Sequence, residues 1–221
     1  QKGMSTGLVA TSTVTHATPA SFGAHVDYRK KESEIAEQFA MADIDVILGG
    51  GKKFWPDSLI SVYEERGGQY ISNIDSPVDP SKRLLGLFSE KGLKKSHEGR
   101  VVSTTQMAKL ALANLEDDPD GFFVMIEESQ VDWGGHSNSA EYIRSEMESL
   151  NELVDFVLDF QKENPEVLVV LTADHECGGV AVHDGENGKL DVRFTSDYHS
   201  ANFVPIWATG PGADVFDAFM D

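Results

Sequence analysis

Acidic and imidazole side chains follow two apolar runs of the sequence. Asp174 and His175 come directly after "VLVVLTA", and Asp132 and His136 come shortly after "GFFVMIEE". Carboxylates and imidazoles are ligands that zinc commonly takes in proteins. One such pair also occurs by chance at a surface turn. The sequence therefore predicts a metal site only if separate pairs come together in the fold.

Other candidate ligands flank further apolar runs. Glu127 ends "GFFVMIE", His199 precedes "VPIWATG", and His16 and Thr18 follow "TGLVATS". Glutamate and hydroxyl oxygens suit magnesium, which prefers oxygen ligands. Taken singly, each is an ordinary loop residue, and Thr18 before Pro19 is typical of a helix N-cap. Their joint presence beside four runs favours a metal centre over chance.

Strands and helices that would position these residues alternate along the chain. Residues 139–163 carry apolar side chains at steps of three and four, which predicts an amphipathic helix. Ser103 and Gln106 form the pattern of a capping box, which predicts a helix over about 104–116. A further helix is predicted over 19–29. The expected strands are "TGLVATS", "DVILGGG", "GFFVMIE", "VLVVLTAD" and "VPIWATG".

This alternation predicts an α/β fold with a mainly parallel central sheet flanked by helices on both faces. Sites in such sheets form beyond the carboxyl ends of the strands, where the candidate ligands lie. Residues 1–221 are expected to form a single domain. Residues 52–100, broken by glycine and proline, are expected to be a less regular excursion from the sheet.

Composition excludes several functions. The formal net charge of −19 argues against binding nucleic acid or an anionic membrane through bulk charge. No apolar stretch is long enough to cross a membrane. The single cysteine, Cys177, excludes an internal disulfide and reads as a packed small side chain. His25, His97 and His183 read as surface or packing residues.

Five motifs carry a family resemblance. They are "TSTVTHATPASFGAHVDYR", "DVILGGGKKFW", "GFFVMIEESQVDWGGHSNS", "LTADHECGG" and "YHSANFVPIWATGPG". In content and order they resemble the alkaline phosphatase family, particularly its compact bacterial members. The resemblance implies a phosphate monoester hydrolase with two zinc ions and one magnesium ion. The implied site residues are Asp132, His136 and His199 for the first zinc, Asp174 and His175 for the second, Thr18 and Glu127 for magnesium, and Arg29 as a phosphate clamp.

Two positions follow variation known within the family. His16 stands where some members have aspartate near the magnesium, and Trp133 stands where some have lysine or histidine. The resemblance places both residues close to the site. Trp133 is interpreted either as a substrate contact or as an apolar cover on its loop.

The resemblance also implies that this chain is an internal portion of a catalytic domain, incomplete at its N-terminus. The family forms a phosphoserine on a serine in an Asp-Ser-Ala-like motif, and no such motif is found in this chain. The chain alone is therefore expected to be inactive. The complete enzyme is expected to be periplasmic or secreted, to act on small phosphate monoesters and to form a homodimer. Two alternatives stay open: another superfamily hydrolase (a phosphodiesterase or sulfatase) and a zinc-binding fragment without turnover.

Overall fold

The computed structural model describes residues 3–219 of the chain. It divides into two compact units, Gln1–Ser129 and Gln130–Asp221. Each unit is described by itself, and the expectation that they belong to one catalytic domain stays a prediction. Among the described residues, no helix is long and apolar enough to cross a membrane.

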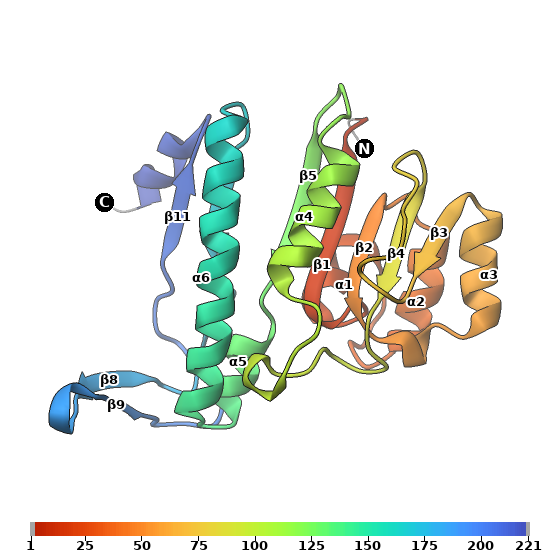
Figure 1. Ribbon diagram of the computed structural model, residues 1–221. Coiled ribbons are helices and arrows are strands. Elements are labelled where there is room, and N and C mark those ends of the chain that lie inside the picture. The colour runs from red at the N-terminus through yellow and green to blue at the C-terminus, as the bar shows by residue number, and fades with distance from the viewer. Residues whose placement is uncertain (1–2, 220–221) are drawn as a thin grey trace. The chain divides into compact units, whose positions relative to one another are not determined.

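The first unit is built on a five-stranded sheet in the order β3-β4-β2-β1-β5, and every neighbouring pair of strands is parallel. The expected α/β fold with a mainly parallel sheet is therefore confirmed (Figure 1). The strands are β1 (Ser5–Thr13), β2 (Val46–Gly50), β3 (Gly68–Ile71), β4 (Arg83–Leu87) and β5 (Phe122–Glu127). The helices are α1 (Ala17–Gly23), α2 (Glu32–Met41), α3 (Asp57–Glu65) and α4 (Thr104–Leu115), with short 3-10 turns at Lys52–Phe54 and Ser96–Glu98.

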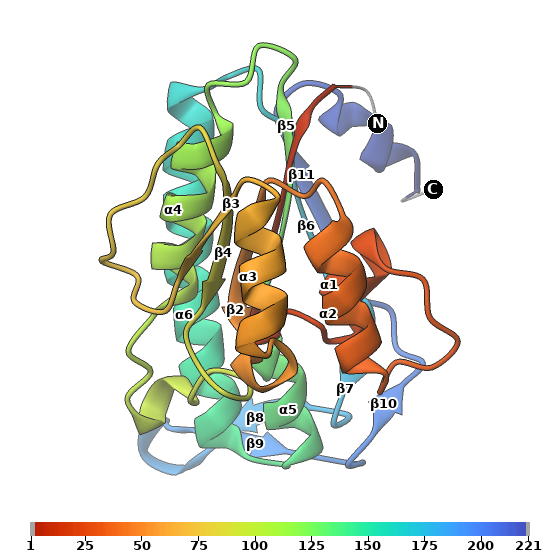
Figure 2. The same ribbon diagram turned by 90° about the vertical axis from the view of Figure 1, so that its right-hand side faces the viewer.

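Helices cover both faces of this sheet, as Figures 1 and 2 show. Successive strand residues point to opposite faces, so Leu8 packs with α1, α2 and α3, whereas Val9 packs with α4. Both residues are almost fully buried. This two-sided burial explains why the strands are continuously apolar and do not alternate with polar residues.

Two predictions for the first unit are corrected. Residues 52–100 are not an excursion from the sheet, because they contribute β3 and β4 to it. The helix predicted over 19–29 is α1, which ends at Gly23. A side chain at Gly23 would approach Cδ1 of Ile44 to 2.6 Å and the ring of Phe39 to 2.9 Å, so a larger residue would have to displace these two side chains where the helix ends. Arg29 consequently lies in a loop.

Over its described residues, 130–219, the second unit contains two helices, three two-stranded antiparallel pairs and two 3-10 segments. The expected strands at 169–172 and 206–209 are present, but they pair with each other and run antiparallel. The helices are α5 (Gln130–His136) and α6 (Ala140–Glu163). The paired strands are β6 (Val169–Thr172) with β11 (Ile206–Thr209), β7 (Glu176–Cys177) with β10 (His199–Ser200), and β8 (Ala181–Asp184) with β9 (Leu190–Arg193). The 3-10 segments are Glu186–Gly188 and Ala213–Phe219.

Two helix predictions are confirmed closely. The α4 helix begins after Ser103, whose hydroxyl accepts from the Gln106 N–H while the Gln106 side chain accepts from the Ser103 N–H. This reciprocal pair satisfies two backbone donors that the helix leaves free. The α6 helix spans 24 residues and is capped by the hydroxyl of Ser139.

Candidate metal centre

Three predicted ligands of the second unit lie together. Asp132 and His136 are one turn apart on α5, which places both side chains on the same face of the helix. Nε2 of His136 lies 3.5 Å from Oδ2 of Asp132. Nε2 of His199, from β10, lies 3.4 Å from the other oxygen of the same carboxylate. Asp132 is therefore the centre of a cluster supplied by a helix and a distant strand.

Cys177 joins this cluster, which sequence reasoning did not foresee. One ligand atom from each of Asp132, His136, Cys177 and His199 lies within 4.8 Å of the other three. The sequence shows only that Cys177 lies two residues after the predicted ligand His175. Its place in the cluster follows from the pairing of β7 with β10, which the sequence does not reveal.

Hydrogen bonds define which atoms of the cluster face inward. His136 Nδ1 lies 2.7 Å from the backbone oxygen of Asp197, to which it donates, so Nε2 is left to bind a metal. Oδ1 of Asp132 is buried and accepts no hydrogen bond. A buried carboxylate oxygen that lacks a hydrogen bond and lies beside an imidazole nitrogen fits an atom that binds a cation.

Electrostatics around Cys177 disfavour a free thiolate in the absence of metal. Burial raises the pKa of the Cys177 thiol to about 12, and its hydrogen bond to Asp132 and that residue's charge add to the rise. The position of this thiol is explained by its hydrogen bond to Asp132.

The predicted ligands of the second zinc form a separate pair. Nε2 of His175 lies 3.2 Å from Oδ2 of Asp174, whose side chain is 72% exposed. The Nδ1 atom of His175 is buried without a hydrogen-bond partner, and the ring stacks on His199 with centroids 3.5 Å apart. The stacking places this pair beside the four-donor cluster.

The magnesium candidates belong to the first unit. Glu127 is the last residue of β5 and pairs with Ala10 of β1. The hydroxyls of Ser12 and Ser129 both donate to its Oε2 atom. Thr18 lies in α1, a helix that contacts both β1 and β5. Glu127 thus ends β5, and Thr18 lies in the helix that follows β1, the parallel neighbour of β5.

Arg29 and His16 also meet in the first unit. Nη2 of Arg29 lies 3.3 Å from Nε2 of His16, and the arginine is exposed. Beside them is a hollow of about 480 Å³, bordered by α1 and the loop that carries Arg29. The guanidinium is therefore accessible to an anion from solvent.

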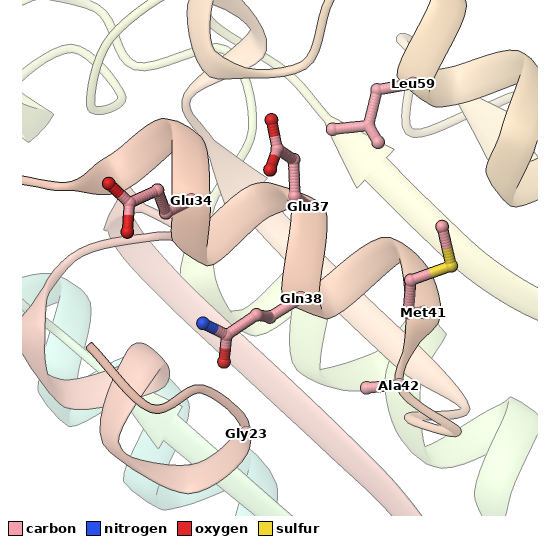
Figure 3. A pocket seen from close by; sticks show the side chains of 7 residues that line it. All are labelled: Gly23, Glu34, Glu37, Gln38, Met41, Ala42 and Leu59. Atoms are coloured by element: carbon pink, nitrogen blue, oxygen red, sulfur yellow. The ribbon is translucent and has the colours of Figure 1, made fainter.

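A larger hollow of the first unit, of about 810 Å³, carries no ligand set (Figure 3). Figure 3 shows Glu34, Glu37 and Gln38 along α2, with Leu59 opposite.

Trp133 follows Asp132 on α5 and is half-buried. His25, His97 and His183 are exposed, in keeping with a surface role.

The fold and the cluster together define an α/β protein with a candidate centre for a divalent cation. The sequence profile described as "Alkaline phosphatase" matches residues 1–187. The chain belongs to the alkaline phosphatase family. It is 40% identical over 194 residues to "Alkaline phosphatase 3" of Bacillus subtilis (strain 168), which covers 82% of this chain and 42% of that protein. It is 32% identical over 219 residues to the "Repressible alkaline phosphatase" of Saccharomyces cerevisiae, with 80% of this chain and 39% of that protein covered.

Solved structures agree with the family. The alkaline phosphatase from the Antarctic bacterium TAB5 matches with a TM-score of 0.89 and 31% identity over 97% of this chain and 68% of its own. A variant of that enzyme, described with magnesium bound in its M3 site, matches with a TM-score of 0.88, 31% identity and the same coverage of 97% and 68%. The cold-active alkaline phosphatase of Shewanella sp. gives 0.90 at 25% identity, over 97% of this chain and 72% of its own. The predicted family resemblance is confirmed.

Proposed function

We propose that the protein containing this chain is an alkaline phosphatase that hydrolyses phosphate monoesters. The observation that carries the proposal is the convergence of Asp132, His136 and His199 on one cluster in a chain of this family. The chain spans 42% of the length of the Bacillus subtilis relative, so the activity is proposed for the whole protein.

The donor set fits the two kinds of ion that we propose. Asp132, His136 and His199 would hold one zinc ion, and Asp174 and His175 would hold a second. Oδ1 of Asp132 and Nδ1 of His175 are buried without a hydrogen bond, and Nε2 of His199 lies 3.4 Å from that Oδ1. These atoms support zinc at these places, since buried polar atoms need partners. Thr18 and Glu127 would hold magnesium through oxygen. When bound, such ions act as Lewis acids and lower the pKa of a coordinated oxygen.

Other residues of the chain bind and orient the phosphate. Arg29 presents a planar guanidinium that can donate two parallel hydrogen bonds to phosphate oxygens. His16 contacts this guanidinium, with its Nε2 atom 3.3 Å from Nη2. The Asp197 carbonyl accepts from Nδ1 of His136, which fixes the tautomer that leaves Nε2 free to bind a metal. Trp133, beside Asp132, would cover the cluster with an apolar ring.

The route that we propose forms a phosphoserine on a serine that the motifs of this chain do not supply. A covalent intermediate divides one difficult displacement into two easier ones. We further propose small phosphate monoesters as substrates, a homodimer as the assembly, and the periplasm or the exterior of the cell as the location. These finer proposals rest on family membership.

Ester specificity tests the proposal. The full-length protein would be assayed with p-nitrophenyl phosphate, bis(p-nitrophenyl) phosphate and p-nitrophenyl sulfate. We expect the monoester to react fastest, the activity to vanish in Asp132→Ala, and zinc to restore activity after chelation. Asp191→Ala is the matched control, because this acid pairs with Arg193 away from the cluster. Faster diester or sulfate hydrolysis would replace the proposal with another superfamily activity. Metal binding without any hydrolysis would favour a non-catalytic protein.

A further inference from the structure

Glu32 joins the two segments that carry His16 and Arg29. Its Oε2 atom accepts hydrogen bonds from the hydroxyls of Thr13, at 2.5 Å, and Thr15, at 2.8 Å. We propose that Glu32 is a positioning residue for phosphate binding, because it holds Arg29 where the guanidinium meets His16. The inference rests on the proposed function, in which Arg29 binds phosphate, and adds the residue that sets the place of this arginine.

The two threonines belong to the end of β1 and to the turn that follows it. Thr13 is the last residue of β1, and both Thr13 and Thr15 are buried. The carbonyl of Thr13 accepts from the N–H of His16 at 2.9 Å, which closes a turn that contains Thr15. The backbone of His16 is therefore fixed directly beside the two hydroxyls that Glu32 accepts from.

Glu32 is the first residue of α2 and directly follows a turn that contains Arg29. The N–H of Lys31 donates to the carbonyl of Tyr28 at 3.0 Å, which closes this turn over residues 28–31. Lys31 also pairs with Asp27, but the two side chains are 39% and 79% exposed, and exposed pairs stabilise little. The bonds of Glu32 to the threonines therefore fix the end of the turn that carries the arginine.

The contact of Glu32 with the threonines and the contact of Arg29 with His16 connect the same two segments. His16 directly follows Thr15, and Arg29 lies three residues before Glu32. The threonines are buried, whereas Arg29 is exposed and borders the hollow of about 480 Å³. The buried contact therefore holds the two backbones together, and the guanidinium beside it stays open to solvent.

A fixed backbone at Arg29 bears on the affinity for phosphate. An arginine side chain has many rotamers, and ordering such a side chain in a complex costs free energy. The contact between Nη2 of Arg29 and Nε2 of His16, at 3.3 Å, selects one arrangement before an anion binds. This contact needs the two backbones at their present separation, which the Glu32 bonds maintain. Loss of those bonds should therefore weaken anion binding although the guanidinium itself is unchanged.

Two substitutions separate the hydrogen bonds of Glu32 from its charge. Both hydroxyls donate to one oxygen, so the amide oxygen of Glu32→Gln can accept from both, whereas Glu32→Ala removes the acceptor. Glu34→Ala is the matched control. Glu34 also lies in the first turn of α2, where an acid interacts favourably with the helix dipole. Its carboxylate is 56% exposed and pairs with Lys31 at 3.6 Å instead of with the threonines.

Inhibition by inorganic phosphate measures the effect in the full-length protein, with p-nitrophenyl phosphate as the substrate. We expect Glu32→Ala to raise the inhibition constant about 2–10-fold, the range that ordering one flexible side chain costs. Glu32→Gln and Glu34→Ala should stay close to the wild type. In an Arg29→Ala background, Glu32→Ala should change the constant no further, because the two residues act as one unit. A general loss of stability would not produce this dependence on Arg29.

The outcomes distinguish this inference from the proposed function. If Arg29→Ala raises the inhibition constant and Glu32→Ala does not, the positioning role is overturned and the phosphate clamp stands. A further rise on adding Glu32→Ala to Arg29→Ala would also overturn the role, because Glu32 would then act through another group. An unchanged constant in Arg29→Ala itself would remove the clamp from the proposed function. If circular dichroism shows that Glu32→Ala misfolds, the near-isosteric Thr15→Val decides, since it removes one donor and should raise the constant only where Arg29 is present.

Discussion

Arg100 and Glu128 form an almost fully buried ion pair in the first unit. Nη1 of Arg100 lies 2.9 Å from Oε1 of Glu128, and the side chains are 4% and 2% exposed. The second carboxylate oxygen accepts from the Thr104 hydroxyl, and Nε of Arg100 donates to the carbonyl of Lys94. This network fixes the backbone directly after Glu127, a proposed magnesium ligand.

Removing the arginine should therefore destabilise the first unit. Arg100→Ala leaves a buried carboxylate without its cation, and breaking such a pair costs about 3–5 kcal/mol. Lys95→Ala is the control, because its pair with Glu98 is exposed at 40% and 50% and such pairs contribute at most about 1 kcal/mol. Urea unfolding would measure both variants, and equal losses would contradict the argument.

Acid should selectively weaken the contact between Ser5 and Asp118. The Ser5 hydroxyl, followed by the Asp120 N–H, lowers the pKa of Asp118 below its ordinary 3.8. A carboxylate with a lowered folded-state pKa stabilises the protein above the unfolded-state pKa, and the effect is lost as pH falls through the folded-state value. The difference in urea midpoint between wild type and Ser5→Ala should thus be largest near neutral pH and shrink below 3.8.

A matched serine variant controls for general effects of acid. The Ser61 hydroxyl donates to the backbone carbonyl of Asp57, not to a carboxylate. Its removal should therefore shift the midpoint equally at every pH. If Ser61→Ala shows the same pH dependence as Ser5→Ala, the carboxylate is not its source.

His199→Ala should remove one zinc ion from the protein and most of its activity. The imidazole lies 3.4 Å from Asp132 and stacks on His175, so its loss affects both groups of proposed zinc ligands. Elemental analysis of the purified full-length protein measures the zinc content. His183→Ala, an exposed histidine on β8, should keep its zinc. Unchanged zinc content in His199→Ala would remove this residue from the ligand set.

Arg29→Ala should weaken phosphate binding more than zinc binding. The guanidinium is exposed beside His16 and is proposed to contact substrate, not metal. Loss of a charged hydrogen-bonding partner corresponds to about 1.5–3 kcal/mol, or roughly 10–150-fold in the inhibition constant of inorganic phosphate. Lys30→Ala removes a neighbouring charge and should change this constant little. Equal inhibition of wild type and Arg29→Ala would exclude the clamp.

Much of the fold could be predicted from local pattern. The run containing Leu8 and Val9 is apolar because both faces of the sheet are covered, and the capping residues of α4 are visible in the sequence. The β3 strand could not be predicted in this way. Its first residue, Gly68, looks like a turn signal, but a side chain there would lie 2.2 Å from the Tyr63 ring. A contact with α3 therefore sets the residue type, and no local pattern reveals it.

The candidate site, too, could be predicted from the sequence only in part. The spacing of Asp132 and His136 suffices to place both on one helical face, so their proximity could be expected. The place of Cys177 in the cluster depends on which residue of a distant strand it faces. That pairing joins Cys177 to a residue 22 positions further along the chain and is fixed only in the folded chain.

The two strands that carry Cys177 and His199 are each only two residues long. So few ladder hydrogen bonds resist local opening weakly, and a bound ion would cross-link β10, which carries His199, to α5, which carries Asp132 and His136. Binding to the folded form alone adds about 2.7 kcal/mol when free metal is one hundred times its dissociation constant. Metal supply would then govern how readily proteases cut this part of the chain. Scarcity of zinc would thus shorten the lifetime of the protein and also lower its proposed catalytic rate.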